Sequence, residues 1–138
     1  MTHPTVFPTL TYDDARAAIE FLVNAFGGER HAVYEGDDGS IRHAELRFGN
    51  GIVMLGSARG DFPATRGAGG GVYIVVDDPD SLYARAREAG AEIVRELRDE
   101  DYGSRGFGAK DPEGNQWYFG TYQPFAVQHT QTEAVTSP

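Results

Sequence analysis

The chain has 138 residues, a formal net charge of −9 and no cysteine. This length suits one domain with a sizeable core, and the missing cysteine excludes disulfides, thiolate metal sites and a cysteine nucleophile. The acidic charge argues against nucleic acid as a partner, because Lys and Arg would have to neutralise its phosphates; no apolar run approaches the roughly 18 residues of a membrane span, so no membrane partner is expected.

The first half of the chain predicts a strand, a helix and three further strands. Residues 10–14 form a short strand-like run that ends in two aspartates, and the second of these can cap a helix over 14–26. Apolar residues recur at helical spacing within this helix, and the Gly27-Gly28 pair ends it. The three strands after it are expected over 29–35, 41–48 and 51–56.

The second half repeats the same order of elements. They are expected over 72–76, 79–89, 92–97, 104–110 and 116–122. Asp78 follows Asp14 by 64 residues (78 − 14), and Asn115 follows Gly51 by the same number (115 − 51). Two distant landmarks that keep one register indicate an internal duplication.

We predict a single domain over residues 1–122, with module one at 5–56, a linker at 57–71 and module two at 72–122. The linker is rich in glycine, like a phosphate-binding loop, but it leads into a strand and lacks the Gly-Lys-Ser/Thr ending of such loops. Residues 123–138 form a polar tail that we expect to fray. The first ten residues lack a charged region followed by an apolar one, so we expect no secretory signal and a cytoplasmic location.

Four segments together resemble a known family: residues 9–29, 43–56, 72–92 and 111–122. The chain resembles the vicinal oxygen chelate superfamily of glyoxalases, bleomycin-resistance proteins and extradiol dioxygenases. The resemblance implies an α+β fold, in which two tandem βαβββ modules form a curled mixed-sheet half-barrel cup with the helices outside. It also implies a small-molecule ligand in the cup and a homodimer. It constrains the function less, because this fold hosts isomerases, dioxygenases, thiol transferases and passive drug binders.

Strand alternation assigns the side chains to two faces of each sheet. With residues 50–51 as a two-residue hairpin loop, the face toward the helices carries Ala44, Leu46, Phe48, Val53 and Leu55. The face toward the cup carries His43, Glu45, Arg47, Ile52 and Met54. The repeat register then assigns Trp117 and Phe119 to the core. Tyr118 is assigned to the cup, with Phe107 as its neighbour on the adjacent strand.

In the metalloenzymes of this superfamily, each module offers one metal ligand from its first strand and one from its last. By resemblance, these positions fall on Phe7, Met54, Gly71 and Tyr118. None of them is His, Asp or Glu, the side chains that a divalent cation needs when thiolates are absent. We therefore expect no metal site and no cofactor.

His43 and Glu45 are the candidate catalytic residues, because they stand two apart on one strand face. They can be read as a general acid/base pair or as part of a relocated metal site. They can also be read as a polar ladder, in which Glu45 pairs with Arg47 and His43 lies at the solvated rim. The ladder is favoured, since ion pairs on sheet faces need no catalytic purpose. His31 is expected at the surface of an edge strand.

We predict a metal-free small-molecule binding protein that sequesters an aromatic or antibiotic-like ligand in the cup, without a covalent step. The predicted ligand-binding residues are Phe7, Thr9, His43, Arg47, Ile52, Met54, Tyr73, Arg105, Phe107 and Tyr118. The alternative is an enzyme, a lyase/isomerase or a dioxygenase, with an unorthodox metal or acid/base site around His43 and Glu45. A regulatory domain that binds a common metabolite is a third possibility.

Overall fold

A computed structural model describes residues 3–68, 70–101 and 103–126. Module one contains β1 (Thr9–Tyr12), α1 (Ala15–Phe26), β2 (Glu29–Glu35), β3 (Ile41–Phe48) and β4 (Gly51–Ser57). Module two contains β5 (Gly71–Val75), α2 (Pro79–Glu88), β6 (Glu92–Asp99), β7 (Arg105–Lys110) and β8 (Gln116–Gly120). A 3-10 helix, η1 (Pro124–Ala126), follows. The remainder of the predicted tail, 127–138, lies outside the described residues.

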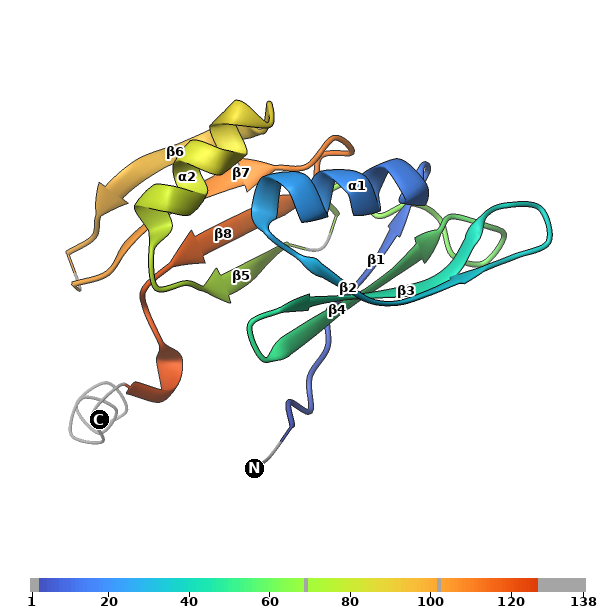
Figure 1. Ribbon diagram of the computed structural model, residues 1–138, viewed down its shortest axis with the longest axis horizontal. Coiled ribbons are helices and arrows are strands. Elements are labelled where there is room, and N and C mark those ends of the chain that lie inside the picture. Colours follow the sequence, from blue (N-terminus) through green and yellow to red (C-terminus); the bar gives the residue numbers. More distant parts are fainter. Residues whose placement is uncertain (1–2, 69, 102, 127–138) are drawn as a thin grey trace.

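Each module contributes one four-stranded mixed sheet, in the orders β1-β4-β3-β2 and β5-β8-β7-β6. The first and last strands of a module pair in parallel and the other neighbours are antiparallel. The two sheets are not closed into a barrel, and the two helices lie together on one side of them (Figure 1). The predicted α+β fold of two βαβββ modules is therefore confirmed. We call the sheet surface away from the helices the open face.

Both helices begin where the paired aspartates predict. Asp14 Oδ1 accepts from the Ala17 amide at 3.0 Å, and Asp78 Oδ1 accepts from the Ser81 amide at 3.1 Å. These bonds satisfy amides that the first turn of a helix leaves without a backbone partner. Gly27 ends α1 with a φ of 80°, a left-handed conformation that glycine adopts at no steric cost.

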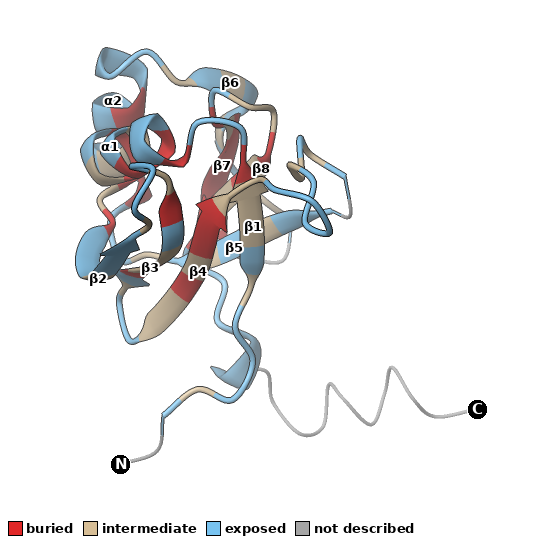
Figure 2. Cartoon of the chain, turned by 90° about the vertical axis from the view of Figure 1, so that its right-hand side faces the viewer, coloured by how far each residue is buried: buried red, intermediate tan, exposed pale blue. Residues whose placement is uncertain are grey.

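The core lies between the helices and the sheets, where Figure 2 shows buried segments on β4, β7 and the inner sides of both helices. Phe26 of α1 packs on Phe119 of β8 with ring centroids 4.9 Å apart, and on Trp117 at 5.6 Å. Phe48 of β3 packs on Trp117 from the other module at 5.7 Å. One aromatic core therefore joins the two modules, and the prediction that Trp117 and Phe119 belong to it is confirmed.

The repeat register holds for every element but one. Thr9 pairs with Met54, and 64 residues later Tyr73 pairs with Tyr118. In the hairpins, however, Ala44 pairs with Leu55 while Phe107 pairs with Phe119. Leu55 and Phe119 are 64 residues apart (119 − 55), whereas Ala44 and Phe107 are 63 apart (107 − 44). The turn before β8 is one residue longer than its counterpart, so β7 is shifted by one residue.

A one-residue shift exchanges the two faces of a strand. The prediction that Phe107 faces the cup beside Tyr118 is therefore wrong. Phe107 is 2% exposed and stacks on Phe119 at 5.1 Å, on the side of the helices. The residue opposite Tyr118 is Gly108, which gives module two an open face without a side chain at this place.

The linker is partly ordered against β1. Thr65 Oγ1 accepts from the Thr11 amide at 3.1 Å and donates to the Thr11 carbonyl at 2.7 Å. Arg59 and Phe62 form an isolated bridge within the same loop. The linker therefore forms a wall over the end of β1 and β4, as well as connecting the modules. Within the described part of the chain, neither helix has the length and apolar character needed to cross a membrane.

Candidate functional site

The open face of module two contains a cavity of about 260 Å³, which we call the tyrosine pocket. Its lining residues are Tyr73, Arg95, Glu100, Ser104, Gly106, Phe107, Tyr118, Phe119 and Gly120. Tyr73 and Tyr118 are register partners on parallel strands, so both rings project to the same side. Phe107 and Phe119 are themselves almost fully buried, and the two tyrosines supply the aromatic surface.

Glycines on both neighbouring strands fix how the Tyr118 ring lies. A Cβ added at Gly71 would be 2.8 Å from Tyr118 Cε2, and one added at Gly108 would be 2.9 Å from Cδ1. Opposite edges of the ring therefore contact β5 and β7. The Tyr118 hydroxyl donates to Gln116 Oε1, two residues back along β8. The ring thus lies along the sheet, with one aromatic face turned toward the open side.

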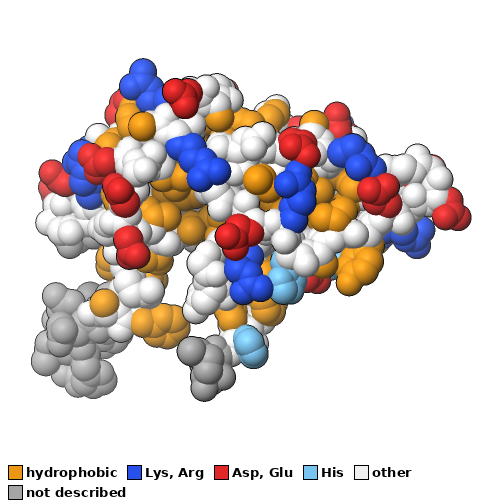
Figure 3. Space-filling model, viewed as in Figure 1, with side chains coloured by type: hydrophobic (Ala, Val, Ile, Leu, Met, Phe, Trp, Pro, Cys, Tyr) orange, Lys and Arg blue, Asp and Glu red, His pale blue; other side chains and the backbone are white. Residues whose placement is uncertain are grey.

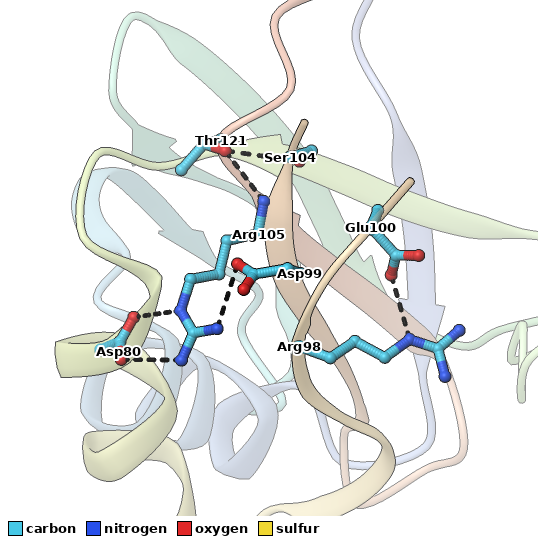
Figure 4. Close-up of polar contacts among 7 residues, drawn as sticks. All are labelled: Asp80, Arg98, Asp99, Glu100, Ser104, Arg105 and Thr121. Atoms are coloured by element: carbon cyan, nitrogen blue, oxygen red, sulfur yellow. Dashed lines mark hydrogen bonds and ion pairs between the residues drawn. The ribbon is translucent and has the colours of Figure 1, made fainter. Parts of the chain in front are cut away.

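The charges beside the tyrosine pocket neutralise one another. Arg95 donates to Glu100 Oε2 from Nη2 at 2.7 Å and from Nε at 3.2 Å, and Arg98 reaches the same oxygen at 3.2 Å (Figure 4). The Arg95 guanidinium holds the pKa of the Glu100 carboxyl below its ordinary value, and Arg98 adds to this effect. The tyrosine pocket therefore offers aromatic surface without a free charge from this cluster.

The open face of module one contains a second cavity, of about 300 Å³, which we call the arginine pocket. Its lining residues are Thr9, Leu10, Thr11, Arg42, His43, Met54, Leu55, Gly56, Ser57, Arg59, Phe62 and Thr65. Of the predicted ligand-binding residues, Thr9, His43 and Met54 meet here. Thr9 and Met54 are register partners, as Tyr73 and Tyr118 are in module two. The two pockets are therefore related by the internal repeat but differ in chemistry.

His43 and Glu45 are in direct contact, because His43 Nε2 lies 2.8 Å from Glu45 Oε2. His31 approaches the other carboxylate oxygen at 3.8 Å, and its Nδ1 lies 2.8 Å from Arg47 Nη2. Arg47 can only donate, so His31 Nδ1 accepts and the neutral ring carries its proton on Nε2. The expected pair of Glu45 with Arg47 is not formed among the described residues, and Glu45 pairs with His43 instead.

Arg105 does not serve the open face. Since β7 is shifted, Arg105 projects to the side of Phe107 and meets α2. Its Nε donates to Asp80 Oδ1 at 2.8 Å, its Nη2 to Asp80 Oδ2 at 3.1 Å, and its Nη1 to Asp99 Oδ1 at 3.2 Å (Figure 4). The prediction of Arg105 as a ligand-binding residue is therefore corrected: the side chain is committed to two carboxylates.

Three other predicted residues line neither pocket. Arg47 and Ile52 lie on the open face of module one, and Phe7 precedes β1 with 37% exposure. Sequence reasoning missed Arg42, Arg59 and Phe62. Two of these are in the linker, where their large side chains among glycines were the available signal. Arg42 was missed because β3 is irregular between His43 and Ile41, which brings Arg42 to the pocket together with His43.

The described residues contain no group of three or more His, Asp or Glu placed to hold a metal ion. The side chains that stand together on the first and last strands are Thr9 with Met54 and Tyr73 with Tyr118. None of these is a carboxylate or an imidazole, so the residues present do not fit a resident divalent cation at these positions.

Comparison with solved structures supports this fold. TioX from Micromonospora sp. ML1 is 32% identical with a TM-score of 0.72, over 89% of this chain and all (100%) of that one. The bleomycin-binding protein of Streptomyces verticillus, solved with copper(II)-bleomycin, has a TM-score of 0.63 at 23% identity, over 89% of this chain and 99% of that one. The second likeness is one of fold alone.

Sequence comparison extends to whole proteins. The uncharacterized protein Mb0911c of Mycobacterium bovis is 35% identical over 131 residues, which cover 85% of this chain and 82% of the relative. A family model matches residues 3–119, which is most of the chain. The chain therefore belongs to the Glyoxalase/Bleomycin resistance protein/Dioxygenase superfamily.

Proposed function

We propose that this protein binds a small aromatic or antibiotic-like molecule on its open face without a metal ion, and sequesters it without a covalent step. The observation that carries the proposal is the Tyr118 ring, which lies flat between Gly71 and Gly108 with one face open. A flat aromatic ligand gains dispersion and quadrupole interactions on such a surface. Tyr73 extends the aromatic surface on the neighbouring strand.

Two further observations support this reading. The inward positions of the first and last strands carry Thr, Met and Tyr, which favour organic ligands over a divalent cation. The S. verticillus protein of the same fold is described by its complex with copper(II)-bleomycin, so this fold can hold an antibiotic.

A panel of hydrophobic aromatic natural products tests the proposal by thermal shift and by quenching of Trp117 or tyrosine fluorescence. Saturable binding with one ligand per chain is expected, and protein treated with a chelator should bind equally well. Tyr118→Ala should weaken binding about tenfold, while Tyr118→Phe keeps the ring and should stay within about threefold. Equal binding by Tyr118→Ala and the wild type would contradict the proposed site.

A second candidate function is a lyase/isomerase or dioxygenase. It is favoured by the contact between His43 and Glu45, because a carboxylate that orients an imidazole is suited to proton transfer, and His43 lines the arginine pocket. Metal analysis of protein purified without chelator tests the metal-dependent version. Less than about 0.1 equivalents of transition metal, with no gain on adding Ni, Zn or Fe, would remove it.

We also propose a homodimer and a cytoplasmic location. Large apolar side chains are exposed on both outer strands of the sheets, among them Val33 and Tyr34 on β2 and Val94 on β6. Such residues at a sheet edge are candidates for contact with a second chain. Light scattering after size exclusion should give twice the chain mass; a single-chain mass at micromolar concentration would refute the dimer. Cell fractionation checks the location.

A further inference from the structure

The arginine pocket contains cations that lack partners. Most arginines of this acidic chain are engaged: Arg16, Arg30, Arg66, Arg95, Arg98 and Arg105 pair with carboxylates, Arg85 donates to carbonyls, and Arg47 contacts His31. The guanidinium groups of Arg42 and Arg59 form neither an ion pair nor a hydrogen bond within the part of the chain that the structure describes. Arg59 lies over the Phe62 ring, 5.4 Å from its centroid.

Hydrogen-bond donors surround these two arginines, and no carboxylate lines the pocket. Ser57 Oγ accepts from the Ile41 amide at 2.9 Å, which leaves its own proton to donate. Thr9 places a second hydroxyl on the wall, beside Met54. An uncharged pocket would not need this concentration of donors without acceptors.

The nearest acidic residues do not neutralise the arginines by contact. Asp37 and Asp38 line an adjoining cavity of about 360 Å³ that shares Arg42 and Arg59. Asp38 Oδ1 instead accepts from the Ser40 hydroxyl at 2.6 Å and from the Ser40 amide at 3.0 Å. The net charge of −9 acts from a distance, where salt screens it beyond about 8 Å. Charges of both signs are interspersed over the surface that Figure 3 shows.

We propose that the arginine pocket binds the anionic group of an amphipathic ligand, a carboxylate, sulfonate or phosphate joined to an apolar body. Arg42 and Arg59 donate to the anion, since a planar guanidinium matches its oxygens. Met54 and Phe62 contact the apolar part. This inference rests on the proposed binding function and specifies its ligand as an anion, which the tyrosine pocket does not, because Glu100 already occupies Arg95 there.

Two fluorescent probes with the same ring system test the proposal. Anilinonaphthalene sulfonate carries an anionic group, and N-phenylnaphthylamine is its uncharged counterpart. Both are titrated into wild type, Arg42→Gln, Arg59→Gln, Tyr118→Ala and the control Arg30→Gln, which removes the same charge from an exposed ion pair with Glu20. Thermal midpoints confirm that each variant is folded. Displacement by naphthoate or by naphthyl phosphate then distinguishes a carboxylate from a phosphate as the preferred group.

Each pocket variant is expected to weaken the sulfonate about fivefold to tenfold and to leave the neutral probe within about twofold, while Arg30→Gln changes neither. Higher salt should also weaken the sulfonate alone. Equal sulfonate affinity in wild type, Arg42→Gln and Arg59→Gln overturns the anion site; if Tyr118→Ala still loses both probes, the proposed aromatic function survives. If only the arginine variants lose the sulfonate, the anion site stands and the aromatic platform fails.

Discussion

The Tyr12 hydroxyl donates a 2.6 Å hydrogen bond to Asp111 Oδ2, which joins the first strand of module one to the last turn of module two. Both residues are buried, and the same oxygen accepts from Trp117 Nε1 at 3.1 Å. The other oxygen accepts from the Asn115 amide at 3.0 Å. A buried carboxylate is stable only when its acceptor sites are satisfied. The modules are therefore held by a complete polar network as well as by their aromatic core.

Tyr12→Phe should lower the free energy of unfolding by about 1–3 kcal/mol, because it leaves a buried acceptor without one of its donors. Urea unfolding followed by Trp117 fluorescence measures the change. Tyr83→Phe is the matched control, since its hydroxyl bonds to Glu96 at an exposed site; it should cost less than about 0.5 kcal/mol. Equal losses in the two variants would show that the Asp111 network has no special weight.

Alkaline pH should destabilise the protein through Tyr12. Burial raises the pKa of the Tyr12 hydroxyl far above its ordinary value of 10.0, and the neighbouring Asp111 carboxylate raises it further. Above pH 10 the unfolded chain releases this proton while the folded chain keeps it, so stability present below that pH is lost as pH rises. Unfolding curves between about pH 8 and 11 should show this decline in the wild type, and a smaller one in Tyr12→Phe.

Glu113 should stabilise α1 from the other module. Its Oε1 accepts from the Asp13 amide at 2.7 Å and its Oε2 from the Asp14 amide at 2.8 Å, so a carboxylate lies at the start of the helix. Glu113→Ala should cost about 1 kcal/mol, and Glu113→Gln, which retains one acceptor, about half of that. Urea titrations at low and high salt measure both. A loss of equal size in the two variants would point to packing as the cause.

The sequence predicts the elements and most side-chain faces because these follow local rules. The paired aspartates that cap α1 and α2 repeat with one spacing, and strand alternation places Met54 and Tyr118 correctly on the open face. The error at Phe107 has a single cause. A turn longer by one residue exchanges the faces of β7, and residue spacing between the helices cannot reveal a change that a later turn compensates.

The site was harder to predict than the fold, since its walls depend on long-range contacts. Arg59 and Phe62 enter the arginine pocket only because Thr65 bonds back to Thr11, 54 residues away. Which cation finds a carboxylate is equally a tertiary property: Arg105 is engaged and Arg42 is not. Composition places both among the basic residues of an acidic chain and does not separate them.

Arg105→Gln should leave ligand binding unchanged, which tests the corrected placement of this side chain. Its guanidinium bonds to Asp80 and Asp99 away from the open face. The affinity of both naphthalene probes should stay within about twofold of the wild type, because no contact in either pocket changes. The pKa of Asp80, held low by Arg105, should return toward its ordinary value. NMR titration of the carboxyl carbons measures this shift; a large loss of probe affinity would return Arg105 to the site.

Gly108→Ala should impair aromatic binding without unfolding the protein. The added Cβ would lie 2.9 Å from Tyr118 Cδ1 and 3.0 Å from Cε1, so the ring must turn off the sheet surface. The ring edge can move, so the stability loss should stay below about 1.5 kcal/mol. Binding of N-phenylnaphthylamine should weaken about tenfold, since its stacking surface is tilted.

Gly60→Ala is the control for this substitution, because its Cβ would meet no atom within 4 Å. It should bind the probe as the wild type does. Near-ultraviolet circular dichroism reports the altered tyrosine environment in Gly108→Ala independently of any ligand. If the dichroism changes while the affinity does not, the Tyr118 ring has moved and the ligand does not depend on it, so the aromatic platform is not the binding surface. If both change together, the glycine on β7 is present because the ring must lie flat for the ligand to stack.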